Sequence, residues 1–455
     1  MNRLVKQMVP WGAALFLVLY GAGCASVQTA KVTPAGNSQA ARAALADQMA
    51  EAESLLQRAL RYSEQGESLA ELAVYDEMIS RYGKSHTLVI RSLVAQAMFN
   101  RAITYGQLGR PKDEIKAYDA MVRRYSRDSD PSLMHLAAKA LYNKAMTFGQ
   151  IGRPKDEART YGEVASRFGG QNHRDTRRVV AQAMFNRAVT LDAMGDARGE
   201  VKAYRALIDQ LVTDSDPEVR QLVAQAYYNM AITLGSMGDP EAEIAAYDQV
   251  AKRYARSRTE SMESLVARAM LNRAITFDQI GMPEEELAGY QLLVDRYARS
   301  RNRVVREQVA KAMVNISITL GQVGRWEASL EAAEKVLHRL GRPTSLALKE
   351  AVAGALVNKG VALSQLGRPV AEMRAYDELV RRFSQSSEKV LQAYVAQSLI
   401  YKAITLGEME RPDEELAVYE EIIRRYGQTQ EPAVLEWVLK ARLNKARLTS
   451  RGAVG

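Results

Sequence analysis

Residues 94–125 read VAQAMFNRAITYGQLGRPKDEIKAYDAMVRRY, and residues 180–211 repeat the pattern as VAQAMFNRAVTLDAMGDARGEVKAYRALIDQL. The asparagine of this stretch returns every 43 residues. It occurs at Asn100, Asn143, Asn186, Asn229, Asn272, Asn315 and Asn358. Gln57, Tyr401 and Asn444 hold the flanking positions. Residues 51–437 therefore form nine blocks of 43 residues without insertion or deletion, and a half-length block follows from Val438.

Each block has the pattern of two helices. In 94–108, apolar or small residues fall on one face at helical spacing, and a second apolar stripe follows in 115–125. Gly109 suits the left-handed residue that ends a helix, and Pro111 suits the first turn of the next helix. Asp130 and Pro131 mark the start of the following block. We predict a first helix of roughly 20 residues and a second of about 15.

Other residue types keep the same period. The glycines are Gly66, Gly109, Gly152, Gly195, Gly238, Gly281, Gly324 and Gly367, with Glu410 as the exception. The tyrosines are Tyr75, Tyr118, Tyr161, Tyr204, Tyr247, Tyr290, Tyr376 and Tyr419, with Ala333 as the exception. A glutamate recurs near the start of each second helix and an arginine near its end. The glutamates suit the helix dipole or bridges between repeats, and the tyrosines have core spacing.

A single helix pair cannot bury its apolar face, whereas stacked pairs share one core. Aligned on Asn100, the small residue Ala102, the inter-helix Gly109 and the aromatic Tyr118 resemble the tetratricopeptide repeat family over nearly all of residues 51–450. The unit is longer than the family's usual 34 residues. The resemblance implies an all-α fold, a right-handed α-solenoid of helix-turn-helix repeats, with a concave groove that holds peptides or protein segments.

Amide side chains are the candidate groove residues. In the first helix Gln96, Asn100 and Gln107 share one stripe, which stacking would turn into a ladder along the chain. The full candidate set is Gln96, Asn100, Gln107, Asn143, Gln150, Gln182, Asn186, Gln225, Asn229, Asn272, Asn315 and Asn358. Such amides can donate to and accept from a peptide backbone. Alternatively, each asparagine bonds the backbone of a neighbouring repeat and fixes the register.

The amino terminus has the pattern of an export signal. A basic start with Arg3 and Lys6 precedes an apolar segment at 13–23 that is too short to span a bilayer. The only cysteine, Cys24, follows small residues and resembles a bacterial lipobox, in which the cysteine is lipidated. We expect a signal peptide at 1–23, then a lipidated cysteine, flexible tether and lead-in at 24–50, and a capping helix and tail at 438–455. The expected location is the bacterial envelope, attached to the outer membrane on the periplasmic side.

Composition narrows the function classes. The formal net charge of +9 is spread over the chain, so no nucleic-acid partner is expected. The four histidines fit no zinc spacing, and no nucleophile, phosphate loop or acid/base pair is found. We therefore expect a non-enzymatic scaffold with a protein or peptide partner, a membrane anchor and no catalytic, metal or cofactor site. The alternatives are a peptidoglycan or carbohydrate-binding module and a cytosolic regulatory solenoid with an uncleaved anchor.

Block 309–351 departs most from the pattern. Trp326 replaces the proline, Ser329 the glutamate and Ala333 the tyrosine. A missing tyrosine ring could open a pocket, unless a large neighbour such as Trp326 refills the space.

Overall fold

The computed structural model describes residues 39–452, and every regular element in this range is an α-helix. The helices form two compact units, the first ending at Gly238 and the second beginning at Asp239. The first unit holds α1 (Gln39–Glu64), α2 (Ser68–Tyr82), α3 (Leu88–Gln107), α4 (Pro111–Tyr125), α5 (Pro131–Gln150), α6 (Pro154–Phe168), α7 (Arg174–Ala193), α8 (Ala197–Leu211) and α9 (Pro217–Ser236). The second unit holds α10 (Pro240–Arg253), α11 (Glu260–Gln279), α12 (Pro283–Arg296), α13 (Arg303–Gln322), α14 (Trp326–Leu340), α15 (Leu346–Gln365), α16 (Pro369–Phe383), α17 (Lys389–Glu408), α18 (Pro412–Tyr426) and α19 (Pro432–Gly452).

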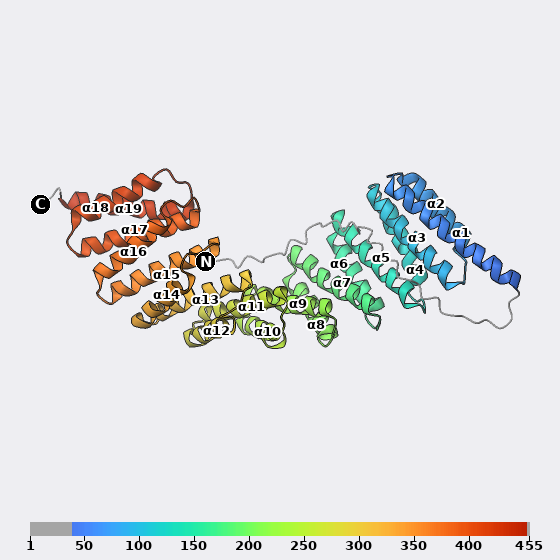
Figure 1. Ribbon diagram of the computed structural model, residues 1–455, viewed down its shortest axis with the longest axis horizontal. Helices are drawn as coiled ribbons and strands as arrows, with labels where there is room; N and C mark the ends of the chain where they lie inside the picture. Colours follow the sequence, from blue (N-terminus) through green and yellow to red (C-terminus); the bar gives the residue numbers. More distant parts are fainter. Residues whose placement is uncertain (1–38, 453–455) are drawn as a thin grey trace. The chain divides into compact units, whose positions relative to one another are not determined.

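The helices of each unit lie in two layers (Figure 1). Odd-numbered helices are the first helices of the repeats, and within a unit each packs beside the first helix of the next repeat, as α3 does with α5 and α11 with α13. Even-numbered helices are the second helices. Among the described helices, their backbones approach only first helices. First helices therefore form the closer-packed, inner layer of each unit, as expected for stacked helix pairs.

The predicted helix pairs are confirmed. From α3 to α17 the first helices have 20 residues, and the second helices from α2 to α18 have 14 or 15. Asp130 caps α5 because its carboxylate accepts from the amides of Ser132 and Leu133 at 2.9 and 3.1 Å. Gly109 has the expected positive φ, at 66°. The fold is thus an all-α solenoid of stacked helix pairs within each unit.

The core follows the same register. The tyrosine of the second helix is almost fully buried in each regular repeat, as with Tyr118 at 1% exposure and Tyr247 at 0%. Alanines of the first helices, such as Ala95 and Ala97, are also fully buried. Alternation of small and large side chains lets helices approach closely while filling the space between them. The expectation that the tyrosines are core residues is confirmed.

A side chain near the end of a second helix caps the second helix of the preceding repeat. The donor and the accepting carbonyl are 41 residues apart. The pairs are Arg124 with Gly83 O, Gln210 with Gly169 O, Arg296 with Ala255 O, Arg339 with Ala298 O and Arg382 with Gly341 O. These carbonyls lie at helix C-termini, where they lack intrahelical partners and carry partial negative charge. The periodic arginines therefore bridge repeats through the backbone.

Within residues 39–452, no helix combines the length and hydropathy needed to cross a bilayer. Cys24, the signal segment at 1–23 and the part of the tether before residue 39 lie outside the described residues.

The turn at Glu410 provides a stability test. Glu410 has φ 59°, whereas its equivalent Gly324 has φ 75°. Because a side chain is strained in this region, we expect Glu410→Gly to stabilise the chain by up to about 1 kcal/mol, and Gly324→Ala to destabilise it by about 1 kcal/mol. Urea unfolding followed by circular dichroism measures both. A stabilising effect of Gly324→Ala would contradict this account of the turn.

Candidate functional site

The candidate groove residues lie on the inner, first-helix layer. Of the glutamines at the ends of the stripe, Gln96, Gln107, Gln150 and Gln182 are exposed, whereas Gln225 is half-buried. The asparagines are half-buried, except Asn272, which is buried at 8% exposure. The glutamines are therefore the amides most accessible to a guest, while the asparagines lie deeper, at the contact between repeats.

Each of six asparagines has a specific partner in the preceding repeat. Its side-chain Nδ2 donates to the hydroxyl of the tyrosine 25 residues earlier. The pairs are Asn143 with Tyr118 (3.3 Å), Asn229 with Tyr204 (3.0 Å), Asn272 with Tyr247 (3.2 Å), Asn315 with Tyr290 (2.9 Å) and Asn444 with Tyr419 (3.2 Å). Asn186 lies 2.8 Å from the Tyr142 hydroxyl and 3.5 Å from that of Tyr161. The partner of the asparagine amide is thus a tyrosine side chain.

The hydroxyl of the tyrosine in turn donates a hydrogen bond to the glutamate four residues earlier in the same helix. Tyr75 donates to Glu71 at 3.1 Å and Tyr419 to Glu415 at 3.0 Å. A threonine of the next repeat meets the same carboxyl group: Thr319 lies 2.8 Å from Glu286, and Thr405 lies 2.8 Å from Glu372. We call the Asn, Tyr, Glu and Thr of one such interface the polar chain. It joins the second helix of one repeat to the first helix of the next.

A glycine makes room for the carboxyl group. A Cβ atom added to Gly149 would lie 2.8 Å from the Glu157 carboxyl, and one added to Gly407 would lie 2.7 Å from that of Glu415. Both distances are below normal contact, so a side chain at these positions would displace the glutamate. The first helix of each of these repeats therefore packs directly on the polar chain.

Burial perturbs the acidity of the polar chain. Desolvation raises the pKa of Glu114, Glu157, Glu286 and Glu372, against the opposing effect of the threonine hydrogen bond. It raises the pKa of Glu243 to about 7. Desolvation likewise raises the pKa of Tyr419 to about 12. The low-dielectric interface thus favours the neutral carboxyl.

A neutral carboxyl also completes the hydrogen bonds. Thr319 lies 2.9 Å from the backbone oxygen of Asn315 as well as 2.8 Å from Glu286, and a hydroxyl has only one hydrogen to donate. When Glu286 is protonated it can donate to Thr319, which then donates to Asn315 O. The hydrogen bonds then run from the Asn315 amide through Tyr290, Glu286 and Thr319 to the backbone oxygen of Asn315, and each bond has one donor and one acceptor.

One interface has lost the polar chain. Between α14 and α15, Ser329, Ala333 and Ala362 stand in the glutamate, tyrosine and threonine positions. Asn358 alone remains, and its Nδ2 atom is buried without a hydrogen-bond partner. Ala333 is fully buried, so the space left by the missing ring is not open to solvent at that residue. The Trp326 ring lies 3.0 Å from where a Cβ of Gly321 would be, which is the space that the glutamate carboxyl takes in other repeats.

A row of ion pairs runs beside the polar chain. A lysine or arginine next to the register position pairs with a carboxylate 25 residues earlier. The pairs are Arg101 with Asp76, Lys144 with Asp119, Arg273 with Asp248, Lys359 with Glu334, Lys402 with Asp377 and Lys445 with Glu420. Isolated exposed pairs contribute little stability. Because the pairs recur at a regular spacing, these charged side chains beside the groove take part in contacts between repeats.

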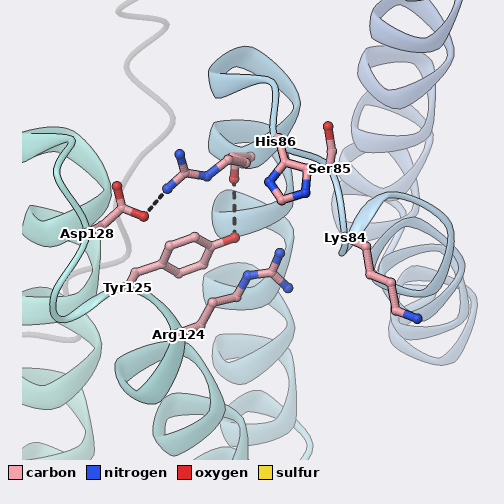
Figure 2. A pocket seen from close by; sticks show the side chains of 7 residues that line it. Lys84, Ser85, His86, Arg124, Tyr125 and Asp128 are labelled. Atoms are coloured by element: carbon pink, nitrogen blue, oxygen red, sulfur yellow. Dashed lines mark hydrogen bonds and ion pairs between the residues drawn. The ribbon is translucent and has the colours of Figure 1, made fainter.

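An open hollow of about 530 Å³ lies where the turn after α2 meets the end of α4 (Figure 2). Arg91 pairs with Asp128, and the Tyr125 hydroxyl donates to Arg91 O at 3.4 Å. Arg124 donates to Gly83 O. Most charged groups of the hollow therefore hold two repeats together. Among the described residues, no group of three or more His, Cys, Asp or Glu side chains is arranged to hold a metal ion.

Comparison with known proteins identifies the repeat. The family model described as tetratricopeptide repeat matches residues 224–256, which cover the later part of α9 and all of α10. The other blocks share the 43-residue register of the matched one. The described chain is therefore built from repeats of the tetratricopeptide type, as the sequence indicates. No curated protein matches the chain.

Several solved structures have similar folds. The apo form of RapI is 10% identical, with a TM-score of 0.46, covering 80% of this chain and 99% of that chain. BtubC from P. vanneervenii is 16% identical, with a TM-score of 0.41 and coverages of 51% and 89%. A tetratricopeptide repeat protein from Parabacteroides merdae is 13% identical, with a TM-score of 0.31 and coverages of 68% and 99%. Similarity at this level carries no information on function.

The contrast between Asn315 and Asn358 tests the polar chain. Asn315→Ala removes a hydrogen bond to Tyr290, so we expect a loss of about 1 kcal/mol in the free energy of unfolding. Asn358→Ala removes a buried donor that has no partner, so stability should stay the same or rise. Urea unfolding of both variants beside the parent measures this. Equal losses would show that the amide contributes through packing alone.

The raised pKa of Glu243 predicts a pH dependence. A carboxyl whose pKa is higher in the folded state binds protons more tightly there, so its contribution to stability is lost as pH rises from the unfolded value of about 4.3 towards 7. Glu243→Gln, which cannot ionise, should lose less stability than the parent between pH 5 and pH 8. We expect a difference on the order of 2 kcal/mol.

Thermal unfolding at the two pH values measures this effect. The exposed Glu327 lies outside the polar chain, so Glu327→Gln is the matched control and should keep the parental pH profile. An unchanged profile in Glu243→Gln would contradict a titrating role for the buried carboxyl.

Proposed function

We propose that this chain is a non-enzymatic scaffold that holds peptides or protein segments along the first-helix layer of its repeats. The observation that carries the proposal is the recurrence of exposed glutamines at two registers of the first helices, Gln96 and Gln182 four residues before the asparagine and Gln107 and Gln150 seven residues after it. Amides at a regular spacing suit an extended segment, because they can bond its backbone without selecting its side chains. Tetratricopeptide repeats serve in general as surfaces for protein interaction, which supports this reading.

The asparagines lie deeper than the glutamines and contribute to the same surface. In the asparagines that have a tyrosine partner, one N–H of the amide is directed to that tyrosine, as in the 3.0 Å bond from Asn229 to Tyr204. A primary amide has a second N–H and a carbonyl oxygen, and these are the groups that could meet a guest. The asparagine would then couple the guest to the polar chain, while the exposed glutamines make the outer contacts.

The aromatic residues favour a protein guest over a carbohydrate. Carbohydrate-binding surfaces need an aromatic face open to the sugar, but the first-helix aromatics pack on second-helix tyrosines. Phe99 lies 6.0 Å from Tyr118, and Phe185 lies 5.6 Å from Tyr204, between ring centroids. Both pairs have the tilted geometry of core aromatic contacts.

The arrangement of carboxyl groups supports a non-catalytic role. The buried glutamates recur in equivalent surroundings, and their partners are core tyrosines and threonines. A catalytic acid or base needs a distinct partner and access to a substrate. We assign the raised pKa values of these groups to the packing of the repeats.

We further propose that the scaffold is tethered to the outer membrane of a bacterial envelope, on the periplasmic side, through a lipid on Cys24. The support is the sequence around the cysteine, with a short apolar segment before it and small residues beside it. Mass spectrometry of the mature amino terminus tests this. We expect a lipidated Cys24 in the parent and a soluble product for Cys24→Ser. An intact amino terminus at Met1 would contradict the proposal and favour an uncleaved anchor.

The groove has a direct test by site-specific photocrosslinking. A photoreactive amino acid placed at Gln107 or Gln150 should crosslink to a partner, because both positions are exposed on the first-helix layer. The matched control position is Lys116, which is exposed on the second helix α4 and should give no adduct. Equal crosslinking at Lys116 would contradict binding at the first-helix layer.

A triple variant tests the contribution of the glutamine side chains. Replacement of Gln107, Gln150 and Gln182 by alanine should weaken partner capture about tenfold, since three exposed hydrogen bonds of about 0.5 kcal/mol each give this factor. Thermal unfolding should not change, because these side chains are exposed. Unaltered capture would reject the role of the glutamines.

A further inference from the structure

The last described helix, α19, occupies the place of a first helix. Its Asn444 donates to Tyr419 at 3.2 Å, and its Lys445 pairs with Glu420 at 2.7 Å, as the equivalent residues do in earlier repeats. It packs against both α17 and α18. One side of α19 is therefore buried in the same way as the corresponding side of every preceding first helix.

The opposite side of α19 has no cover among the described residues. In a regular repeat the residue five positions before the asparagine is a fully buried alanine, such as Ala95 or Ala396. The residue one turn later faces the second helix of the same repeat, as the contact of Phe99 with Tyr118 shows. In α19 these positions are Leu439 and Leu443, which are 54% and 52% exposed.

At the first position of the uncovered side, the side chain of α19 is larger and more apolar than the buried alanine of regular repeats. Leu439 replaces an alanine, and with Leu443 and Ala446 it forms a stripe at helical spacing. We call this stripe the α19 face. Exposed leucines one turn apart would each gain from burial, which is the usual sign of a helix-binding surface. A polar cap alone does not account for them.

The chain's own second helices show what fits such a face. They have 14 or 15 residues, bury a stripe of apolar residues and a tyrosine, and carry acidic residues in the first turn. In α18 that turn holds Asp413, Glu414 and Glu415. The α19 face is flanked by the exposed basic residue Arg447 and by Arg442, which also donates to Gly427 O at 3.0 Å. An acidic amphipathic helix is therefore complementary to the face in both shape and charge.

We infer that the α19 face binds an amphipathic helix of another protein, with an acidic first turn. A second copy of α19 fits less well, because it would bring the arginines of both copies together. This surface is separate from the amides of the proposed groove.

A synthetic peptide with the sequence of residues 412–426 is a suitable probe, since it has the charge and apolar pattern of a second helix. Fluorescence polarisation with the full chain should show binding in the micromolar range. Leu439→Glu combined with Leu443→Glu should weaken binding at least tenfold. Arg447→Glu should also weaken it.

The matched control is Leu69→Glu, because Leu69 is 73% exposed on α2, far from α19 in the sequence. This variant should bind the peptide as the parent does, and all variants should keep the parental circular dichroism spectrum. Binding that is absent, or that persists in the double leucine variant, would overturn the inference. A parent dimer in analytical ultracentrifugation that Leu439→Glu dissociates would assign the face to a second copy instead.

The proposed groove and the proposed binding at the α19 face can be tested independently of each other. The Gln107, Gln150 and Gln182 triple alanine variant should bind the peptide with parental affinity. A loss of peptide binding in that variant would place the peptide in the groove and overturn the inference, while leaving the proposed function supported.

Discussion

The hydrogen bond between the asparagine of one repeat and the tyrosine of the preceding repeat sets the contact on which the other contacts depend. The tyrosine is buried with a polar hydroxyl, and burial of that group without a partner would cost free energy. Its partners, the asparagine and the glutamate, come from two adjacent repeats. Stacking in any other register would leave several buried groups unsatisfied. Apolar burial favours association of the repeats, and the polar chain selects one alignment for it.

Loss of the polar chain between α14 and α15 shows that its members act together. Ser329, Ala333 and Ala362 replace three of them at the same interface, whereas the other interfaces of regular repeats retain the tyrosine and glutamate. A glutamate without its tyrosine and threonine would be a buried polar group without partners, which is costly. The interface has become apolar instead, and the unpaired Nδ2 of Asn358 is the remaining trace of the usual arrangement.

The sequence is sufficient to predict the helices, their lengths and their stacking, because the 43-residue period and the Gly and Pro positions specify them. It also shows the periodic Glu, Tyr and Asn residues, but not which of them bond to one another. That assignment depends on the rotation of one helix against the next. The simultaneous absence of the glutamate and tyrosine in block 309–351 was the sequence feature that indicated a contact between these two residues. The periodic threonines, such as Thr319, complete the set and could have been recognised from their spacing.

The carbonyl caps give the repeat array a direction. Gly83 O is capped by Arg124 of the next repeat, and Gly341 O by Arg382, so these second helices are completed by the repeat that follows them. During synthesis from the amino terminus, the newest repeat would always have an open helix end until its successor emerged. At the far end, Arg442 of α19 donates to Gly427 O at 3.0 Å, from a different position in the register. In α19, a residue of a first helix thereby caps the preceding second helix, a role that the following second helix has in earlier repeats.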